Sequence, residues 1–481
     1  MLGVDLGTTS CKSMIFSYDG NILGGSYTEY GLIIGKEGHI EQSTDIWWQN
    51  VKNSIKNSIT EAGIDGRKIK ALSISSQGIS IVPVDKSGNA LMNAISWLDG
   101  RAIEEAEAIT CAYGAQSIFH TMGKPVLPAY VLPKLMWIKK NAPEIYKNTW
   151  KFMMGMDFLL YRLCGLVITD YSMASGTLCY SIAEKAWFND IFSRFDIDRR
   201  KLPDIGCLGD IAGRVLPAVA EELGLSADCL AVIGAQDQRC ASLGAGIDRG
   251  MATVSLGTAT AICSICSEPV FDRQMKVTCC GFDKNRWMLE SVIGTSGVAL
   301  KWVKDTFFKD LPYSKLDDMA SSSPAGSEGV MFYPYLENNG KGAKGAFTGL
   351  GLHITEGDIV RAVLEGIAYQ IKIHIHSHEA INGAMRQIRL FGGGAKSDIW
   401  ARIIADVTGK TIIIPGTHET ANLGAAIIAG IGAKIYSNCG DAFKTVGAAA
   451  KTFITDPEKH KIYNEYYKAY CSSNEKIMLN S

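Results

Sequence analysis

Apolar and polar positions along the chain predict strands and helices in alternation. Residues 2–6 form an apolar run that ends in glycine and hydroxyl residues, and residues 10–16 form a second β-prone run, so we expect a β-hairpin. Residues 45–64 repeat apolar side chains at helical spacing and close at Gly63, which predicts an amphipathic helix. Residues 69–76 then form a nearly continuous apolar strand, typical of a parallel sheet. The chain therefore opens as an α/β protein.

The opening hairpin has a counterpart in the second half of the chain. Residues 253–262 again run from an apolar strand through Leu-Gly-Thr into another β-prone stretch. In such turns glycine lets a ligand approach the backbone, while N–H groups and hydroxyls donate hydrogen bonds to phosphate oxygens. Asp5, at the end of the first strand, is the kind of oxygen ligand that Mg²⁺ uses directly or through water. The two turns predict a duplicated architecture with a nucleotide between its halves, although either turn alone could be an ordinary polar turn.

Polar side chains stand at the ends of two further predicted strands. Ligands of open parallel sheets lie beyond the carboxyl ends of the strands, so Gln77 is a candidate for contacting substrate hydroxyls. Alternatively, its amide satisfies a turn. Trp97, Asp99 and Arg101 follow the strand that begins at Ala94. The Trp face could pack on a sugar while the acid and the base hold hydroxyls, or the group could be a core Trp beside a surface ion pair.

The middle of the chain carries a single acid at a strand-to-helix junction. Residues 231–236 form a buried-type strand that leads to Asp237 and Gln238, and small residues then open a helix. An aspartate there can accept a proton from a substrate hydroxyl, with Gln238 holding the same substrate. Phosphoryl transfer asks little more of a protein than a positioned base, a metal and donors around the phosphates. Asp237 could instead be a helix N-cap, but its position just before the second phosphate-type turn favours the catalytic interpretation.

A third glycine-rich turn lies at residues 392–394, between a strand at 388–391 and a helix that starts near residue 399. Three glycines there let the backbone lie flat against a purine or ribose. The spacing does not match the Gly-x-Gly-x-x-Gly pattern of nicotinamide-binding proteins, so such a cofactor is not expected. Residues 420–426 predict a helix of small residues suited to close packing beneath the nucleotide.

Composition narrows the class of partner. A chain of 481 residues predicts two or more domains, and 47% hydrophobic and 20% charged residues are typical of a soluble globular protein. Its net charge of -1, with no basic block, argues against nucleic acid as the main partner. The apolar stretch at 421–433 is glycine-broken and too short to span a bilayer, so no membrane contact is expected. Thirteen scattered cysteines and the absence of a leader pattern predict a cytoplasmic location.

The order of the motifs resembles the FGGY carbohydrate kinases, which include xylulose, gluconate and glycerol kinases, within the actin-like ATPase fold. The shared motifs, in chain order, are Asp-x-Gly-Thr-Thr, Trp-x-Asp-x-Arg, Gly-x-x-Asp-Gln, Leu-Gly-Thr and Gly-Gly-Gly-Ala. Residues 345–365 resemble the second family signature throughout, whereas residues 130–141 fit the first signature only in part. The similarity spans essentially the whole chain. It implies two actin-like (ribonuclease H-like) α/β domains of the sugar kinase and actin ATPase superfamily, roughly 1–243 and 244–481.

The resemblance also implies a role for each matched residue. Asp237 corresponds to the general base, and Asp5 and Asp237 lie on the Mg²⁺ side of the site. The first phosphate loop corresponds to Thr8, Thr9 and Lys12, and the second to Gly257 and Thr258. The adenosine-binding turn corresponds to Gly393, Gly394, Ala395 and Asp398, with Asn422 nearby. Trp97, Asp99 and Gln238 fall in substrate-facing positions, beside the strand-end candidate Gln77.

Two departures from the family pattern bear on the substrate. Gly78 and Ile79 stand where glycerol kinases carry Arg-Glu and typical xylulokinases Met-His, and Ala129 stands where glycerol kinases place a tyrosine. Smaller and less polar side chains favour a roomier pocket, and therefore a pentulose, a hexulose or a sugar acid over glycerol.

The resulting hypothesis is ATP-dependent phosphorylation of a sugar hydroxyl, with a ketopentose such as xylulose as first candidate. Gluconate, glycerol and an erythritol-like polyol remain alternatives, and a homodimer is left open. An actin-like ATPase of the chaperone or activator kind is disfavoured because it needs no sugar-binding groups such as Trp97 and Gln238. A catalytically silent sugar sensor is disfavoured because Asp5, Asp237 and both phosphate turns are intact.

Overall fold

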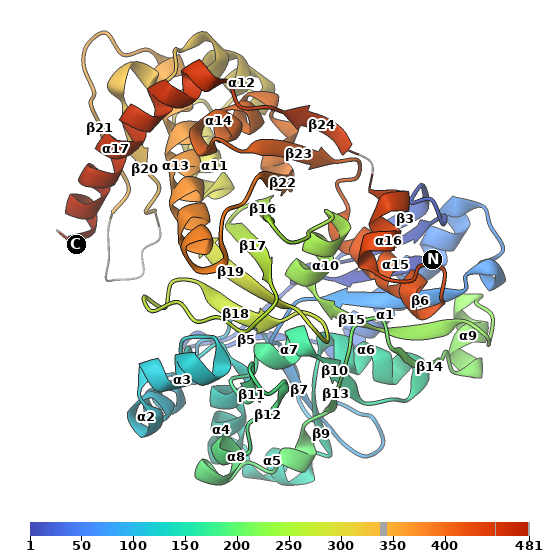
Figure 1. Cartoon of the computed structure of the whole chain (residues 1–481). Helices are drawn as coiled ribbons and strands as arrows, with labels where there is room; N and C mark the ends of the chain where they lie inside the picture. The colour runs from blue at the N-terminus through green and yellow to red at the C-terminus, as the bar shows by residue number, and fades with distance from the viewer. Residues whose placement is uncertain (337–343, 448, 480–481) are drawn as a thin grey trace. The chain divides into compact units, whose positions relative to one another are not determined.

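The computed structural model describes residues 1–336, 344–447 and 449–479. The chain divides into two compact units (Figure 1). Unit 1 consists of Met1–Gly246, Cys266–Met288 and Glu419–Gly447, and unit 2 of Ile247–Ile265, Leu289–His418 and Ala448–Ser481. Both units are discontinuous in sequence, whereas the domains predicted from the family pattern are continuous. The division at residues 243 and 244 stays a prediction.

Unit 1 is built on a mixed sheet with the strand order β14-β15-β6-β1-β2-β3. In that order the strands are Ile211–Arg214, Leu230–Gln236, Ala71–Ser76, Leu2–Leu6, Ser10–Phe16 and Ile22–Glu29. β1 pairs antiparallel with β2 and parallel with β6, and β6 pairs parallel with β15. Every residue of β6 is buried. The predicted opening hairpin and the predicted buried strand are therefore confirmed.

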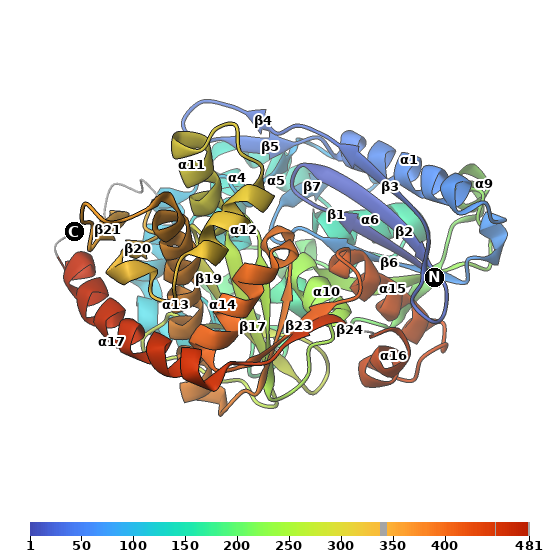
Figure 2. The same cartoon turned by 90° about the horizontal axis from the view of Figure 1, so that it is seen from above.

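Two helices cover opposite faces of this sheet (Figure 2). They are α1 (Thr44–Ala62) and α15 (Thr420–Gly432). Gly3 pairs with Met14, the neighbour of Ser13, so Gly3 and Ser13 point to opposite faces. Ser13 contacts Ser54 of α1 with 2.6 Å between the hydroxyl oxygens. On the other face, a Cβ at Gly3 would lie 2.0 Å from a backbone oxygen of α15, so that helix lies at backbone contact distance.

Unit 1 also contains a small sheet with the strand order β4-β5-β8-β7-β9. Its strands are Ile33–Ile34, Ile40–Gln42, Ala94–Ile95, Ile81–Val84 and Lys151–Met154. The other helices of unit 1 are α2 (Ile103–Tyr113), α3 (Ala115–Met122), α4 (Val131–Asn141), α5 (Pro143–Asn148), α6 (Gly155–Cys164), α7 (Tyr171–Ser175), α8 (Asn189–Arg194), α9 (Pro217–Leu223), α10 (Asp237–Gly244) and α16 (Cys439–Val446). Short strands complete it: β10 (Ile168–Asp170), β11 (Tyr180–Ser181), β12 (Ala186–Trp187), β13 (Asp204–Gly206) and β18 (Thr278–Gly281).

Unit 2 repeats the pattern of an opening antiparallel hairpin joined to parallel strands. Its sheet has the order β19-β17-β16-β22-β23-β24. The strands are Trp287–Ile293, Thr260–Cys266, Met251–Leu256, Gln387–Phe391, Thr411–Pro415 and Ala449–Phe453. β16 pairs antiparallel with β17 and parallel with β22, as β1 does with β2 and β6 in unit 1. The predicted counterpart of the first turn, at residues 253–262, thus belongs to a hairpin with the same strand pairing as the first.

Helices and a short hairpin complete unit 2 (Figure 1). They are α11 (Gly297–Phe307), α12 (Tyr313–Ser322), α13 (Glu356–Asn382), α14 (Asp398–Thr408), α17 (Pro457–Leu479), β20 (Met331–Tyr333) and β21 (Ala346–Thr348). α13 begins with a capping box in which Thr355 and Asp358 each accept a backbone N–H of the other. Its first half is buried almost all round, which is typical of a central core helix. Within the described residues, no helix combines the length and the apolar character needed to cross a bilayer.

Candidate active site

The β1–β2 turn in unit 1 is held by side chains from two other segments. Gly7 closes it by donating its backbone N–H to the Ser10 carbonyl at 2.8 Å. Gln42 donates its amide to the Thr8 carbonyl at 2.7 Å, and Trp97 donates its indole N–H to Thr8 Oγ1 at 2.9 Å. The hydroxyl of a predicted phosphate-loop residue therefore contacts a predicted sugar-facing residue.

Asp5 lies at the end of β1 in mostly buried surroundings. The Ser75 hydroxyl donates to Asp5 Oδ1 at 2.6 Å. Burial raises the pKa of Asp5 above its ordinary range, and the Ser75 hydroxyl and the nearby Lys12 ammonium oppose that shift. A divalent cation beside this carboxylate would compensate the buried charge. Lys12 itself forms an ion pair with Glu419 (Nζ to Oε2, 3.0 Å) in which both side chains are one third exposed.

Asp237 is the first residue of α10, directly after β15. The N-cap of that helix is Gln236, whose side-chain oxygen accepts the backbone N–H of Gln238 at 3.1 Å. The alternative interpretation of Asp237 as the N-cap is therefore wrong. Asp237 Oδ1 accepts the backbone N–H of Gln238 at 2.7 Å and a hydrogen bond from the Gln236 amide. Gln236 and Gln42 both contact predicted site residues, and no motif or spacing in the sequence singled them out.

Gln77 is buried, and its amide is oriented by a chain of hydrogen bonds. Its backbone N–H donates to the Leu6 carbonyl at 2.8 Å, which joins the end of β6 to β1. Its side-chain nitrogen donates to Gln42 Oε1 at 2.9 Å, and Gln42 in turn donates to the Thr8 carbonyl. Because the Thr8 carbonyl can only accept, both amide orientations are fixed. Gln77 Oε1 is left as a buried acceptor without a hydrogen-bond donor among the described residues.

Asp99 holds its own loop together. Its carboxylate accepts the backbone N–H groups of Ile40 (2.6 Å) and Arg101 (3.0 Å), together with Nε and Nη2 of the Arg101 side chain (2.9 and 2.8 Å). Burial favours the neutral acid, but the hydrogen bonds from Arg101 and Ile40 outweigh it and hold the pKa of Asp99 below its usual range. The carboxylate thus has no oxygen turned to a ligand. The Asp99–Arg101 ion pair is buried, and Trp97 is 40% exposed. The alternative considered from the sequence, a core Trp beside a surface ion pair, is therefore wrong.

Lys134 of α4 places a buried ammonium group beneath this region. Its Nζ donates to the carbonyl of Ser96 at 2.8 Å and to that of Ile79 at 3.2 Å. Burial lowers the pKa of Lys134 to about 7, which the nearby Asp99 opposes. The lysine joins the segment after Gln77 to the segment before Trp97, so both predicted substrate-facing segments depend on one buried side chain.

In unit 2 the second phosphate-type turn and the glycine turn line one cavity of about 710 Å³. Its lining comprises Leu256, Gly257, Thr258, Gly297, Val298, Leu300, Lys301, Tyr313, Ser314, Asp317, Gly393, Gly394, Lys396, Ser397 and Trp400. Gly392 has a φ of 92°, and a Cβ there would lie 2.8 Å from the Leu256 carbonyl oxygen, so only glycine fits this turn. The structure thus brings Gly257, Thr258, Gly393 and Gly394 together at one cavity, and their binding of ATP stays a prediction.

The other three residues predicted to bind adenosine do not line this cavity. Ala395 follows Gly394 but is buried, and Asp398 pairs with Lys451 at 2.6 Å. Asn422 belongs to unit 1, where its buried amide donates to the carbonyls of Gly3 and Lys12, both at 3.1 Å. Conversely, Asp317 lines the cavity although no sequence signal marked it. Burial raises its pKa, and the Ser397 hydroxyl, 2.8 Å from Oδ1, opposes that shift.

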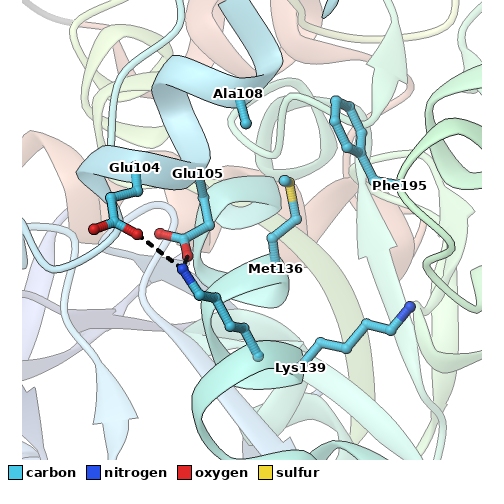
Figure 3. Close-up of a pocket in the computed structure, with 7 residues that line it drawn as sticks. Glu104, Glu105, Ala108, Met136, Lys139 and Phe195 are labelled. Atoms are coloured by element: carbon cyan, nitrogen blue, oxygen red, sulfur yellow. Dashed lines mark hydrogen bonds and ion pairs between the residues drawn. The ribbon is translucent and has the colours of Figure 1, made fainter.

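A second hollow, of about 530 Å³, lies in unit 1 on α2 and α4 (Figure 3). Its lining comprises Glu104, Glu105, Ala108, Met136, Lys139, Lys140 and Phe195. Lys140 pairs with Glu104 at 2.8 Å, and Lys139 pairs with Asp196 at 2.5 Å. The charges around this hollow thus neutralise one another, and none of the predicted site residues line it.

The repeated hairpins and the glycine turn define a class of protein, the two-domain mixed α/β sugar kinases of the actin-like ATPase superfamily. Residues 1–244 match the model of the FGGY family of carbohydrate kinases, N-terminal domain, and residues 252–433 match that of the C-terminal domain. The chain therefore belongs to the FGGY family of carbohydrate kinases. The predicted family, fold class and enzyme class, a phosphotransferase acting on an alcohol group, are confirmed.

The similar proteins include xylulose kinases and gluconate kinases. The chain is 29% identical to a xylulose kinase of Staphylococcus xylosus, over 98% of both sequences. Its structure is similar to that of a ligand-bound xylulose kinase from Lactobacillus acidophilus, with a TM-score of 0.92, 25% identity and coverage of 99% of this chain and 98% of the other. A gluconate kinase from Lactobacillus acidophilus gives a TM-score of 0.91, 25% identity and coverage of 99% and 97%.

Proposed function

We propose that the protein transfers the γ-phosphoryl group of Mg-ATP to a hydroxyl of a ketopentose such as xylulose, with Asp237 as the general base. The observation that carries this proposal is the junction of β15 and α10. There the Asp237 carboxylate, half-buried, is held at one oxygen by two N–H donors of its own turn. A carboxylate fixed in this way can take the proton of a sugar hydroxyl as that oxygen attacks phosphorus.

Asp5 and Asp237 fit a magnesium ion by their chemistry. Both supply carboxylate oxygens, the ligands that Mg²⁺ prefers, at the ends of strands of one sheet. Asp5 lies in β1 and Asp237 directly follows β15, and these two strands flank β6 in the sheet. When bound there, Mg²⁺ would neutralise charge on the phosphate oxygens of ATP. The protein's own part is to orient the two carboxylates.

We assign the adenosine part of ATP to the unit 2 cavity. Gly393 and Gly394 offer a flat backbone there, and Gly257 and Thr258 offer N–H and hydroxyl donors at the same cavity. Thr8, Thr9 and Lys12 supply the corresponding donors in unit 1. Asp398 and Asn422 are engaged in contacts of their own, so we expect Asn422 to support the first hairpin and Asp398 to support the segment after the glycine turn.

The choice of sugar rests on the small residues Gly78 and Ala129 and on the relatives. Trp97 offers an exposed ring face on which a sugar can pack. Gly78 and Ala129 add little bulk. A sugar acid such as gluconate is the second candidate, because a gluconate kinase is as similar in structure as a xylulose kinase.

The test is a coupled ADP-release assay with Mg-ATP and a panel of D-xylulose, other ketoses, polyols and gluconate. We expect one strong acceptor, and we expect Asp237→Asn to keep nucleotide binding while turnover falls about a hundredfold or more. Near-normal turnover of Asp237→Asn would refute the assignment of the base. Glycerol phosphorylation as efficient as that of any sugar would refute the roomier pocket, and ADP release that ignores every sugar would indicate an ATPase.

A further inference from the structure

Gln236 links the proposed base to buried groups behind it. Its side-chain oxygen accepts Nη1 of Arg239 at 3.2 Å and the backbone N–H of Gln238 at 3.1 Å. Since two donors face that oxygen, the amide can adopt only one orientation, with the NH₂ group towards Asp237 Oδ1. The stem of Gln236 packs over Gly78, where a Cβ would lie 3.1 Å from Gln236 Cγ.

Buried groups fix Gln236 from behind. Its backbone N–H donates to the Ser172 hydroxyl at 2.9 Å, and that hydroxyl donates to Asp170 Oδ1 at 3.0 Å. Asp170 also accepts the backbone N–H groups of Ser172 and Met173, both at 2.9 Å. Burial raises the pKa of Asp170 to about 6, while these hydrogen bonds and the nearby Arg239 charge oppose the shift. Asp170 and Arg239 are both buried, and Arg239 is only 2% exposed. Asp170 holds the backbone N–H of Gln236 through Ser172, and Arg239 holds the side-chain oxygen of Gln236.

We propose that Gln236 is a positioning residue for phosphoryl transfer. Its side-chain amide holds the Asp237 carboxylate through Oδ1. Arg239 holds that amide at its oxygen, while Ser172, backed by Asp170, holds the backbone N–H of Gln236. This inference rests on the proposed function, in which Asp237 is the general base. A base that rotates freely spends less time in the geometry that accepts the proton, so the loss of this hold lowers turnover more than substrate binding.

Two variants at one position separate positioning from helix capping. Gln236→Met keeps the length of the side chain but removes both the donor and the acceptor. Gln236→Glu keeps an acceptor for Gln238 and Arg239 but removes the donor and brings a second carboxylate to Asp237. A pure cap would tolerate the glutamate and suffer from the methionine. A positioning role predicts the opposite ranking, with kcat lowered about tenfold by methionine and further by glutamate.

The measurements are kcat and KM for D-xylulose and for ATP, with gluconate as acceptor if it is the better substrate of the unchanged enzyme. Mg-ADP titration counts the folded sites, so a lower kcat is not mistaken for inactive protein. We expect both KM values within about twofold of the unchanged enzyme, as for an interaction that acts at the transition state. Gln49→Met, the same change at an exposed glutamine of α1, is the matched control.

Asp237→Asn measured in parallel separates the two hypotheses. If Asp237→Asn keeps turnover, the proposed function of Asp237 fails whatever Gln236 does. If Asp237→Asn loses turnover while Gln236→Glu matches the unchanged enzyme, Asp237 stands and the positioning role of Gln236 is overturned. A fall in kcat for both Gln236 variants that is larger for glutamate than for methionine, at unchanged KM and full Mg-ADP stoichiometry, supports the inference, whereas the reverse order indicates a cap and overturns it.

Discussion

Hydrogen-bonding capacity decides what single residues of the site can do. Asp99 is a residue type that often binds a substrate. Its carboxylate, however, accepts hydrogen bonds from the Arg101 side chain and from the backbone N–H groups of Ile40 and Arg101. Gln77 is less conspicuous in sequence but keeps a buried acceptor. Lys134 carries a charge into the core and uses it to join two loops. The role of each polar side chain thus depends on the hydrogen-bond partners that surround it, and residue type alone does not decide it.

Lys134 gives a prediction about pH. Burial lowers the pKa of Lys134 from 10.5 to about 7. At a pH between these two values, Lys134 binds a proton in the unfolded chain but not in the folded protein. Stability from this group therefore rises with pH above about 7, on the order of 1 kcal/mol per pH unit, until the unfolded lysine also loses its proton. We expect the unchanged protein to gain stability over Lys134→Met from pH 7 to pH 9, measured by urea unfolding.

Parallel stability curves for the unchanged protein and Lys134→Met over that pH interval would contradict the prediction, because they would show an ammonium that stays charged. Lys86→Met, at an exposed lysine of the β7–β8 connection, is the matched control.

At the scale of elements, glycines let helices approach to backbone contact. A Cβ at Gly424 of α15 would lie 1.9 Å from the Cys240 carbonyl oxygen of α10, and one at Gly244 would lie 1.9 Å from the Thr420 carbonyl oxygen. α10 begins with Asp237, so this crossing supports the proposed base. The small residues at 420–426 were predicted to pack closely, and the structure confirms the close packing, against α10 and β1.

Gly424→Ala tests this crossing. Alanine alone would favour a helix over glycine by about 1 kcal/mol, but the new methyl group must displace a backbone carbonyl. We expect a net loss of about 1–3 kcal/mol of unfolding free energy, as for overpacked cores, and a lower turnover. Gly31→Ala, at an exposed glycine with nothing within 4 Å of a new Cβ, is the control for urea unfolding. A more stable Gly424→Ala protein would show that the helices are free to separate.

At the scale of the whole molecule, unit 1 takes segments from three parts of the chain. The helix α15, from residues 420–432, covers one face of β1, β6 and β15. The segment Cys266–Met288 adds contacts such as the Gly281 N–H to the Ser175 hydroxyl at 2.8 Å. The N-terminal sheet therefore depends on residues that follow it by hundreds of positions.

A fragment of residues 1–243 is expected to aggregate or to unfold without cooperativity, because its sheet exposes the apolar face that α15 covers. The measurements are near-UV circular dichroism and urea unfolding of the purified fragment. Joining residues 1–246 to 419–447 through a short Gly/Ser linker restores α15 and is expected to improve solubility and cooperativity. Native-like cooperative unfolding of residues 1–243 alone would show that the predicted continuous domain is sufficient.

Short-range patterns were enough to predict much of this protein. The opening hairpin, the buried β6, the matching turn at Gly257 and the glycine turn at Gly393 all follow from local rules for strands, turns and backbone freedom. Their order along the chain identified the family of carbohydrate kinases. These features depend on neighbours within a few residues, so they can be recognised before any packing is known.

Only the tertiary structure decided which polar groups pair. Gln42 reaches Thr8 and Gln77 from another strand, and Asp317 reaches the cavity from a distant helix. Asp99 is occupied by Arg101 and Ile40, and Asn422 belongs with β1. A buried donor or acceptor must find a partner, and which partner it finds depends on segments far away in the sequence that packing brings near. Sequence thus determined the class of chemistry, and packing determined which side chains are left to perform it.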